Sequence, residues 1–219
     1  MRILFTLFVF SLSIVSSFSQ VNISELRHYL FPEFVMGKVL MKNGTEYKTL
    51  INYNSLTEEM VYENNGKKLA IGKDAIDKID TIFVNNRKFV SLNKTFVELV
   101  SHSTYDLFVE HKCKIKDPGK SAGYGGKSET TAITSYSSFY SGGLLYNLNL
   151  PEGYEVKPYV YYWIKKNGEF KHIENMQQLK KYYPDKKALF KSFVKEHNIK
   201  FNIPENIVQL VEFLESGKD

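Results

Sequence analysis

The chain has little cysteine and, beyond its first fifteen residues, no segment that is apolar for long enough to cross a membrane. Its single cysteine, Cys113, leaves no pair for an intramolecular disulfide, so the core has to stabilise the fold. The five histidines form neither an HxH nor an HExxH spacing, and the nucleophile-elbow and P-loop motifs are missing. We therefore expect no metal and no cofactor, and no catalytic residues can be named.

The first nineteen residues have the pattern of a secretory signal peptide. Arg2 precedes an apolar run at 3–15, which is short against the roughly 20 residues that span a bilayer. The small residues Ser17 and Ser19 predict cleavage before Gln20. We expect a mature chain that is exported to the periplasm or the extracellular space. An uncleaved anchor is the alternative.

Positive charge gathers near the C-terminus. Residues 171–200 contain eight lysines and three acidic residues. An exported protein meets little nucleic acid, so this excess suggests an anionic envelope surface or simple solubility. Lys187, Lys191 and Lys195 recur every four residues and would form one helical stripe. We expect a solvated face there, with peripheral contact to anionic lipid as the alternative.

Asn-Gly turns organise the chain as a succession of hairpins. Residues 34–53 alternate with a period near two around Asn43 and Gly44, which tolerate the positive φ of a type I′ turn. The signal recurs at 65–66, at 167–168 and, in an Asn-Asn form, at 85–86. Both faces of the first hairpin are fairly apolar, so at least one should be buried.

Turn signals every eight to twelve residues predict about eight short strands between residues 34 and 116. More strands are expected at 144–150, 155–165 and 170–173. From residue 174 the period becomes helical, and Asn175, Pro184 and Pro204 mark three helix starts. The pattern predicts a mainly β protein with C-terminal helices (α+β), an antiparallel sandwich or open barrel built from hairpins. A β-rich domain would span 20–173, and a helical segment packed on it 174–219.

A long stretch rich in Gly, Ser, Thr and Tyr interrupts the strands at 117–143. A connection of this length is usually either mobile or functional. We expect the half at 118–129 to be mobile and the aromatic half to dock more tightly. Tyr124 in this loop is a candidate binding residue.

The strand at 154–165 (YEVKPYVYYWIK) is the most distinctive run in the chain. Strand alternation places Tyr159, Tyr161 and Trp163 on one face. Three aromatic side chains in a row could bind sugar rings or a protein partner. We favour packing beneath the C-terminal helices, whose apolar stripes need a surface, and keep an exposed recognition face as the alternative.

Two clusters could carry chemistry but have simpler interpretations. Cys113 shares an apolar strand face with His111, so a buried thiol is expected rather than an activated nucleophile. Glu58 and Glu59, followed by acids at 74, 77 and 80, could be paired carboxylates for acid/base work or a calcium site. The acids alternate with lysines, which favours solvated turns and strand edges.

The run FVMGKVLMKNGTEYKTLINYNSLTEEMVY, the pair Phe89-Val90, the AGYGG segment at 122–126 and the lysine-rich helical end resemble exported proteins of Bacteroidota, chiefly flavobacteria. The resemblance covers most of the mature chain. It implies a bacterial envelope setting and transfers no catalytic residue.

These observations predict a non-enzymatic binding or structural protein of the cell envelope. A glycan or an envelope protein would be its partner, on Tyr159, Tyr161, Trp163 and Tyr124. The alternative is a hydrolase of envelope polymers whose site is assembled from several loops. A pocket with converging His, Asp or Glu would favour the hydrolase, and a flat aromatic surface would favour binding.

Overall fold

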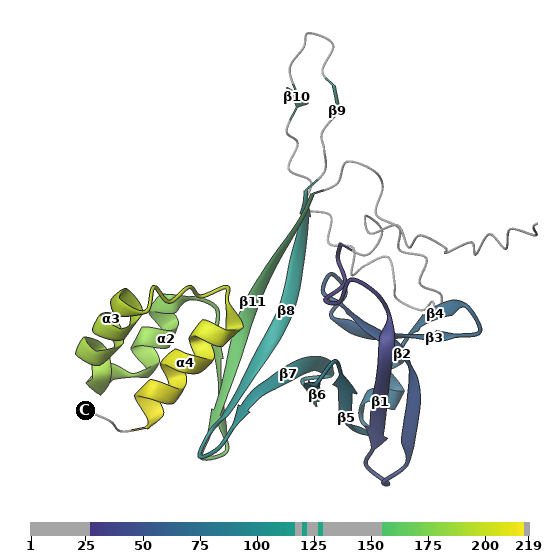
Figure 1. Ribbon diagram of the computed structural model, residues 1–219, viewed down its shortest axis with the longest axis horizontal. Coiled ribbons are helices and arrows are strands. Elements are labelled where there is room, and N and C mark those ends of the chain that lie inside the picture. Colours follow the sequence, from purple (N-terminus) through teal and green to yellow (C-terminus); the bar gives the residue numbers. More distant parts are fainter. Residues whose placement is uncertain (1–26, 117–119, 122–126, 129–154, 217–219) are drawn as a thin grey trace, which may run out of the picture.

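The computed structural model describes residues 27–116, 120–121, 127–128 and 155–216 (Figure 1). The predicted class is confirmed: the described chain is mainly β with C-terminal helices, and its main sheet is open. The expected signal peptide, the expected strand at 144–150 and most of the loop at 117–143, with Tyr124, lie outside the described residues.

Ten strands form one antiparallel sheet in the order β12-β11-β8-β7-β6-β5-β1-β2-β3-β4. Their bounds are β1 Val35–Met41, β2 Glu46–Asn54, β3 Glu59–Asn64, β4 Lys67–Ala70, β5 Ile79–Val84, β6 Arg87–Leu92, β7 Thr95–His102, β8 Asp106–Lys116, β11 Glu155–Lys166 and β12 Glu169–Ile173. Two further short strands, β9 Lys120–Ser121 and β10 Lys127–Ser128, pair with each other. The one-turn helix α1, Lys73–Ile76, carries the chain from β4 back to β5, beside β1.

The strand register shows that one face of this sheet is buried from β1 to β12. The cross-strand row on that face is Val39, Ile82, Phe89, Glu98, Val109, Tyr162 and Ile173, and all seven are buried. The matching row on the other face is Lys48, Lys38, Phe83, Lys88, Leu99, Phe108, Trp163 and His172. Of these only Phe108 is buried; Lys48 and Lys88 are exposed and the other five are partly exposed. The two larger hydrophobic cores therefore lie on one side of the sheet. A third, smaller cluster of Tyr29 and Val61 lies on the other face, where Val61 is opposite Asn52.

The buried face has two cores. At one end the β1–β7 part encloses a cluster that includes Phe31, Ile51, Tyr53 and Phe89. At the other end the helices α2 Met176–Tyr182, α3 Lys187–Glu196 and α4 Pro204–Glu215 cover β8, β11 and β12 (Figure 1). A short 3-10 turn, η3 Pro184–Lys186, joins the first two helices. Buried residues of all three helices pack in one cluster with residues of β8, β11 and β12.

The helix signals in the sequence are also confirmed. Asn175 caps α2 by accepting a hydrogen bond from the backbone N–H of Gln178 (3.0 Å), and Gln178 accepts one from the N–H of Glu174 (2.8 Å). Pro204 begins α4, whose buried stripe is Ile207, Leu210, Val211 and Leu214. Asn198 follows α3 with φ 48°, a conformation that often ends a helix.

Three of the four expected turns have positive φ at both central residues, as a type I′ turn requires: 65–66, 85–86 and 167–168. The turn at 43–44 was predicted wrongly. Gly44 has φ 85°, but Asn43 does not have positive φ, and Met41 and Thr45 close a three-residue loop. The side chain of Asn43 accepts a hydrogen bond from the N–H of Thr45 (3.0 Å), which suits a type I turn followed by a glycine bulge.

Candidate functional site

Strand β11 presents different side chains to the two faces of the sheet. The helices bury one set, Val160, Tyr162 and Ile164. Tyr159, Tyr161 and Trp163 lie on the opposite face, and each is half-buried. Our preferred expectation, that these three pack beneath the helices, is therefore wrong. They lie on the uncovered face instead, as the alternative predicted.

Neighbouring strands extend this row into a larger surface. We name it the aromatic face, and its members are Phe108 of β8, Tyr159, Tyr161 and Trp163 of β11, and Phe170 and His172 of β12. The rings of Trp163 and His172 lie 4.4 Å apart, and Tyr161 meets His172 edge-on at 5.4 Å. Tyr159 meets Tyr161 edge-on at 5.3 Å. The rings brace one another, so the face holds its shape without a ligand.

Glu110 joins the aromatic face through its carboxylate. Trp163 donates its indole N–H to Glu110 (3.2 Å), and Lys112 donates from its ammonium (2.9 Å). His172 Nε2 lies 3.1 Å from the same carboxylate. Burial alone would raise the pKa of Glu110, but the hydrogen bond and charge of Lys112, the indole N–H and the charge of His172 together lower it. Glu110 is thus an ionised, oriented acceptor among aromatic rings.

Glu58 reaches the same cluster from the turn between β2 and β3. It has φ 60°, which is uncommon for a residue other than glycine, and its carboxylate lies 2.6 Å from Lys112 Nζ. The turn is held against β8 because Cys113 donates its backbone N–H to the carbonyl of Ser55 (2.9 Å). Burial raises the pKa of Glu58, against the opposing effect of Lys112.

Glu58 and Glu59 do not lie in a solvated turn as expected. Both are half-buried, and burial raises the pKa of each. Together they line a cavity of about 410 Å³ whose inner wall is formed by Met60, Ile76 and Phe96. Asp74, Asp77 and Asp80 are exposed, which agrees with the solvated interpretation for them.

Two further lysines lie over rings of the aromatic face. Lys114 Nζ lies 5.1 Å from the centre of the Tyr159 ring, and Lys165 Nζ lies 5.3 Å from that of Phe170. With Lys112 5.9 Å above Tyr161, the surface combines rings, ammonium groups and one ionised carboxylate. Such a mixture can hold a ligand that has both flat C–H faces and hydroxyl or anionic groups.

A charged cluster also lies on the buried face. Arg87 donates to both carboxylate oxygens of Glu98, with Nε at 2.6 Å from one of them. His111 Nε2 lies 2.7 Å from Glu98 and 2.8 Å from Arg87. Arg87 also stacks over Phe31 and Phe89. Glu98 and His111 are buried and Arg87 is only partly exposed, so we interpret this cluster as structural.

His111 contacts Glu98 and Arg87, and it does not act as a general base for Cys113 as a nucleophile. The thiol is buried, and burial together with the negative charge of Glu58 raises the pKa of Cys113 to about 12. Native protein at pH 8 should therefore react with a thiol reagent at least tenfold more slowly than urea-unfolded protein. Equal rates in the two states would contradict this prediction.

The other residues predicted from the sequence are the three lysines of one helix and Tyr124. Lys187, Lys191 and Lys195 are all exposed along α3, as the solvated-stripe interpretation predicted. Tyr124 lies outside the described residues. Phe108, Glu110 and Lys112 were not predicted as site residues from the sequence. They have the same strand parity on β8 as the aromatic row has on β11, but this is visible only once β8 and β11 are paired.

Within the part of the chain that the structure describes, no three His, Cys, Asp or Glu side chains are placed to hold a metal ion. In the same ranges no helix has the length and apolar character needed to cross a membrane.

Comparisons with known proteins give no relative: no protein-family model, no curated protein and no solved structure matches the chain. The resemblance to exported proteins of Bacteroidota therefore stays a prediction.

Proposed function

We propose that the mature chain is an exported, non-enzymatic protein of the bacterial cell envelope that binds glycan chains on its aromatic face. One observation carries this proposal: Tyr159, Tyr161 and Trp163 lie in a row on a sheet face that no described helix covers. Aromatic side chains left at the surface in a group usually mark a recognition site.

The polar groups of the face favour a carbohydrate over a purely apolar partner. Sugar rings have apolar C–H faces that pack on aromatic rings, and hydroxyl groups that donate to carboxylates. Glu110 supplies such an acceptor, while Lys112 and Lys114 supply donors beside the rings. A row of rings along one strand suits a polymer chain better than a small, enclosed molecule.

Trp163 is the only tryptophan of the chain, so its fluorescence reports on this face alone. We expect a saturable change in emission when the mature protein is titrated with an N-acetylglucosamine hexasaccharide or with solubilised peptidoglycan. Tyr161→Ala should weaken binding about tenfold, or ~1.4 kcal/mol, because one stacking ring is lost.

The matched control is Tyr47→Ala, which removes an exposed aromatic side chain from strand β2, away from the aromatic face. It should bind both glycans with unchanged affinity. If neither glycan alters the fluorescence of the folded protein, or if the two variants weaken binding equally, the proposal is wrong.

A hydrolase acting on the same polymers is the second candidate, favoured by the pair Glu58 and Glu110. Lys112 bridges the two carboxylates, and their pKa values are shifted in opposite directions. Glycosidases use a protonated and an ionised carboxyl group in this way. The test is whether the mature protein releases new reducing ends from these polymers. If it does, and if Glu110→Gln abolishes the release, the function is hydrolysis rather than binding.

A further inference from the structure

Strand β2 is paired on both sides only along its second half. Its register with β3 covers Ile51 to Asn54, whereas its register with β1 extends from Ile51 back to Glu46. No described strand pairs with the outer side of residues 46–50. We name this stretch the open edge.

The hydrogen bonds nearby show which backbone groups point outward. Tyr53 accepts from the N–H of Leu30, and Ser55 donates to His28, both at 2.9 Å, so these groups face the β1 side. Backbone groups alternate along a strand, so those of Glu46, Lys48 and Leu50 face the other way, toward β3 and the open edge. The pairing of Ile51 with Tyr62 takes up the Leu50 carbonyl, so Leu50 presents only its N–H to the open edge.

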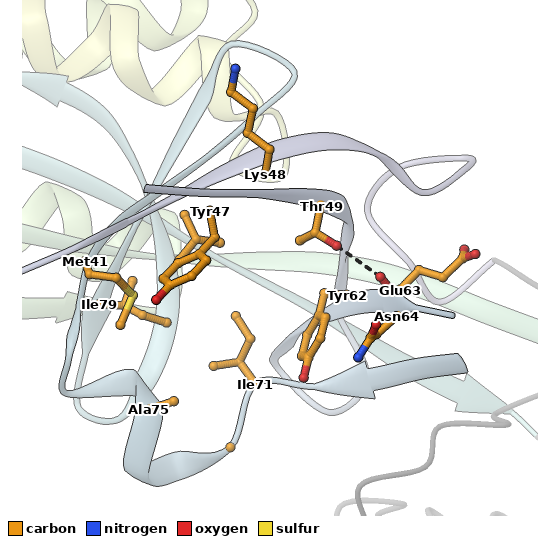
Figure 2. Close-up of a pocket in the computed structure, with 12 residues that line it drawn as sticks. Met41, Tyr47, Lys48, Thr49, Tyr62, Glu63, Asn64, Ile71, Ala75 and Ile79 are labelled. Atoms are coloured by element: carbon orange, nitrogen blue, oxygen red, sulfur yellow. Dashed lines mark hydrogen bonds between the residues drawn. The ribbon is translucent and has the colours of Figure 1, made fainter. Parts of the chain in front are cut away.

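The edge is open because β3 is short. In its register with β2, β3 ends at Asn64, opposite Thr49, and the chain turns back into β4. The hydroxyl of Thr49 donates to the carbonyl of Glu63 (3.0 Å), the last β3 carbonyl that faces β2. A cavity of about 370 Å³ lies beside this stretch of β2 (Figure 2). Figure 2 shows Met41, Tyr47 and Ile79 on one side of the cavity and Tyr62 and Ile71 on the other, while Lys48 points away from it.

We propose that the open edge and this cavity form a strand-addition site for an extended peptide segment of another protein. Backbone groups of the edge would pair with the peptide, and alternate apolar side chains would enter the cavity. In this mode of recognition the backbone supplies affinity and the cavity supplies selectivity. The site is separate from the aromatic face, and the proposal does not depend on glycan binding.

Charge and exposure define the chemistry of the peptide. Lys48 lies opposite Lys38 on the outward face, and among the described residues Lys38 pairs with Glu46 (2.9 Å) while Lys48 has no ion-pair partner. An acidic residue on the outward side of the peptide would therefore complement Lys48. Tyr47 is 56% exposed although it lines the cavity, so an added strand would bury apolar surface. The favoured segment alternates apolar and acidic residues over about five positions, the length of the open edge.

The probe is a fluorescein-labelled peptide in which valine and glutamate alternate over seven residues. Its control is the same peptide with N-methyl groups on the residues that would pair, which blocks strand addition. We expect saturable binding of the first peptide and at least tenfold weaker binding of the second. Hydrogen exchange of the mature protein should slow at the Lys48 and Leu50 amides when the first peptide binds, because these N–H groups point toward the open edge and would gain partners, whereas the Tyr47 and Thr49 amides face β1 and should not change.

Two variants at one position separate the backbone contribution from charge. Lys48→Ala removes the ammonium and keeps the N–H, whereas Lys48→Pro also removes the N–H, on a side where β1 does not need it. Lys48→Pro should bind at least tenfold more weakly than Lys48→Ala, with both variants folded by circular dichroism. Equal binding by the two variants overturns the proposal. The proposal is also overturned if the Lys48 and Leu50 amides are already protected from exchange without peptide. It is overturned as well if their protection rises with protein concentration, because the occupant of the edge would then be a second copy of the chain.

Discussion

Replacing Glu98 with alanine is expected to lower the free energy of unfolding by about 3 kcal/mol at pH 7. Glu98 lies in the buried face, and its carboxylate is the partner of both Arg87 and His111. Without it, a guanidinium and an imidazole in the core lose their anion. Arg87 keeps some exposure, 29% of its side chain, so water compensates in part and the expected loss lies at the low end for a broken buried pair.

The same carboxylate should make the protein sensitive to acid. Burial alone would raise the pKa of Glu98, but the hydrogen bonds and charges of Arg87 and His111 outweigh it and lower the pKa to about 2. The stabilisation is fully present above the ordinary glutamate pKa of 4.5 and is lost as the pH falls from there toward 2. The loss should reach about 3 kcal/mol. Burial also lowers the pKa of His111. The unfolded chain therefore binds a proton at this histidine more readily than the folded protein does, so the free energy of unfolding also falls as the pH drops below the ordinary histidine pKa of 6.5.

Urea unfolding at pH 7 and at several values down to pH 3 measures both effects. Glu98→Gln should be less stable than the parent protein at pH 7 and should lose less stability on acidification. The matched control is Glu46→Ala, which breaks an exposed ion pair with Lys38 and should cost less than about 1 kcal/mol. A parent protein and a Glu98→Gln variant with the same acid dependence would show that another group controls it.

Local features of the fold could be predicted because local chemistry fixes them. The cap at Asn175 depends on a side chain that reaches a backbone N–H three residues away, and the stripe of α4 follows from helical periodicity. The turn at 43–44 failed for an equally local reason. The Asn43 side chain bonds to the N–H of Thr45, which suits a negative φ at Asn43, so the same Asn-Gly pair serves a longer loop.

The candidate site could be predicted only in part, because it depends on pairing between distant strands. Alternation correctly grouped Tyr159, Tyr161 and Trp163, but both faces of β11 are apolar or aromatic, so the sequence does not say which one the helices cover. Glu110 enters the site because it lies opposite Tyr161, 51 positions along the chain. Glu58 enters because a turn docks against the side of β8 at Cys113. No periodicity in the sequence encodes either contact.

The two faces of β11 can be separated by a pair of adjacent substitutions. Tyr162→Ala should destabilise the protein by about 3–5 kcal/mol, because it removes a fully buried ring beneath the helices. The ring of Tyr162 packs edge-on against Phe201 at 5.0 Å, and its hydroxyl donates to the Phe201 carbonyl (2.7 Å). Removing only that hydroxyl in Tyr162→Phe should cost about 1 kcal/mol.

Tyr161→Ala, one residue earlier, should cost less than about 1.5 kcal/mol, because its ring is half-exposed and no helix covers it. Urea unfolding of the three variants measures these differences, and glycan titration of the same preparations tests the other face. Tyr162→Phe should keep full affinity, while Tyr161→Ala should lose about tenfold although it stays folded. If Tyr161→Ala is as destabilising as Tyr162→Ala, the Tyr161 ring belongs to a packed core, and the aromatic face is no binding surface.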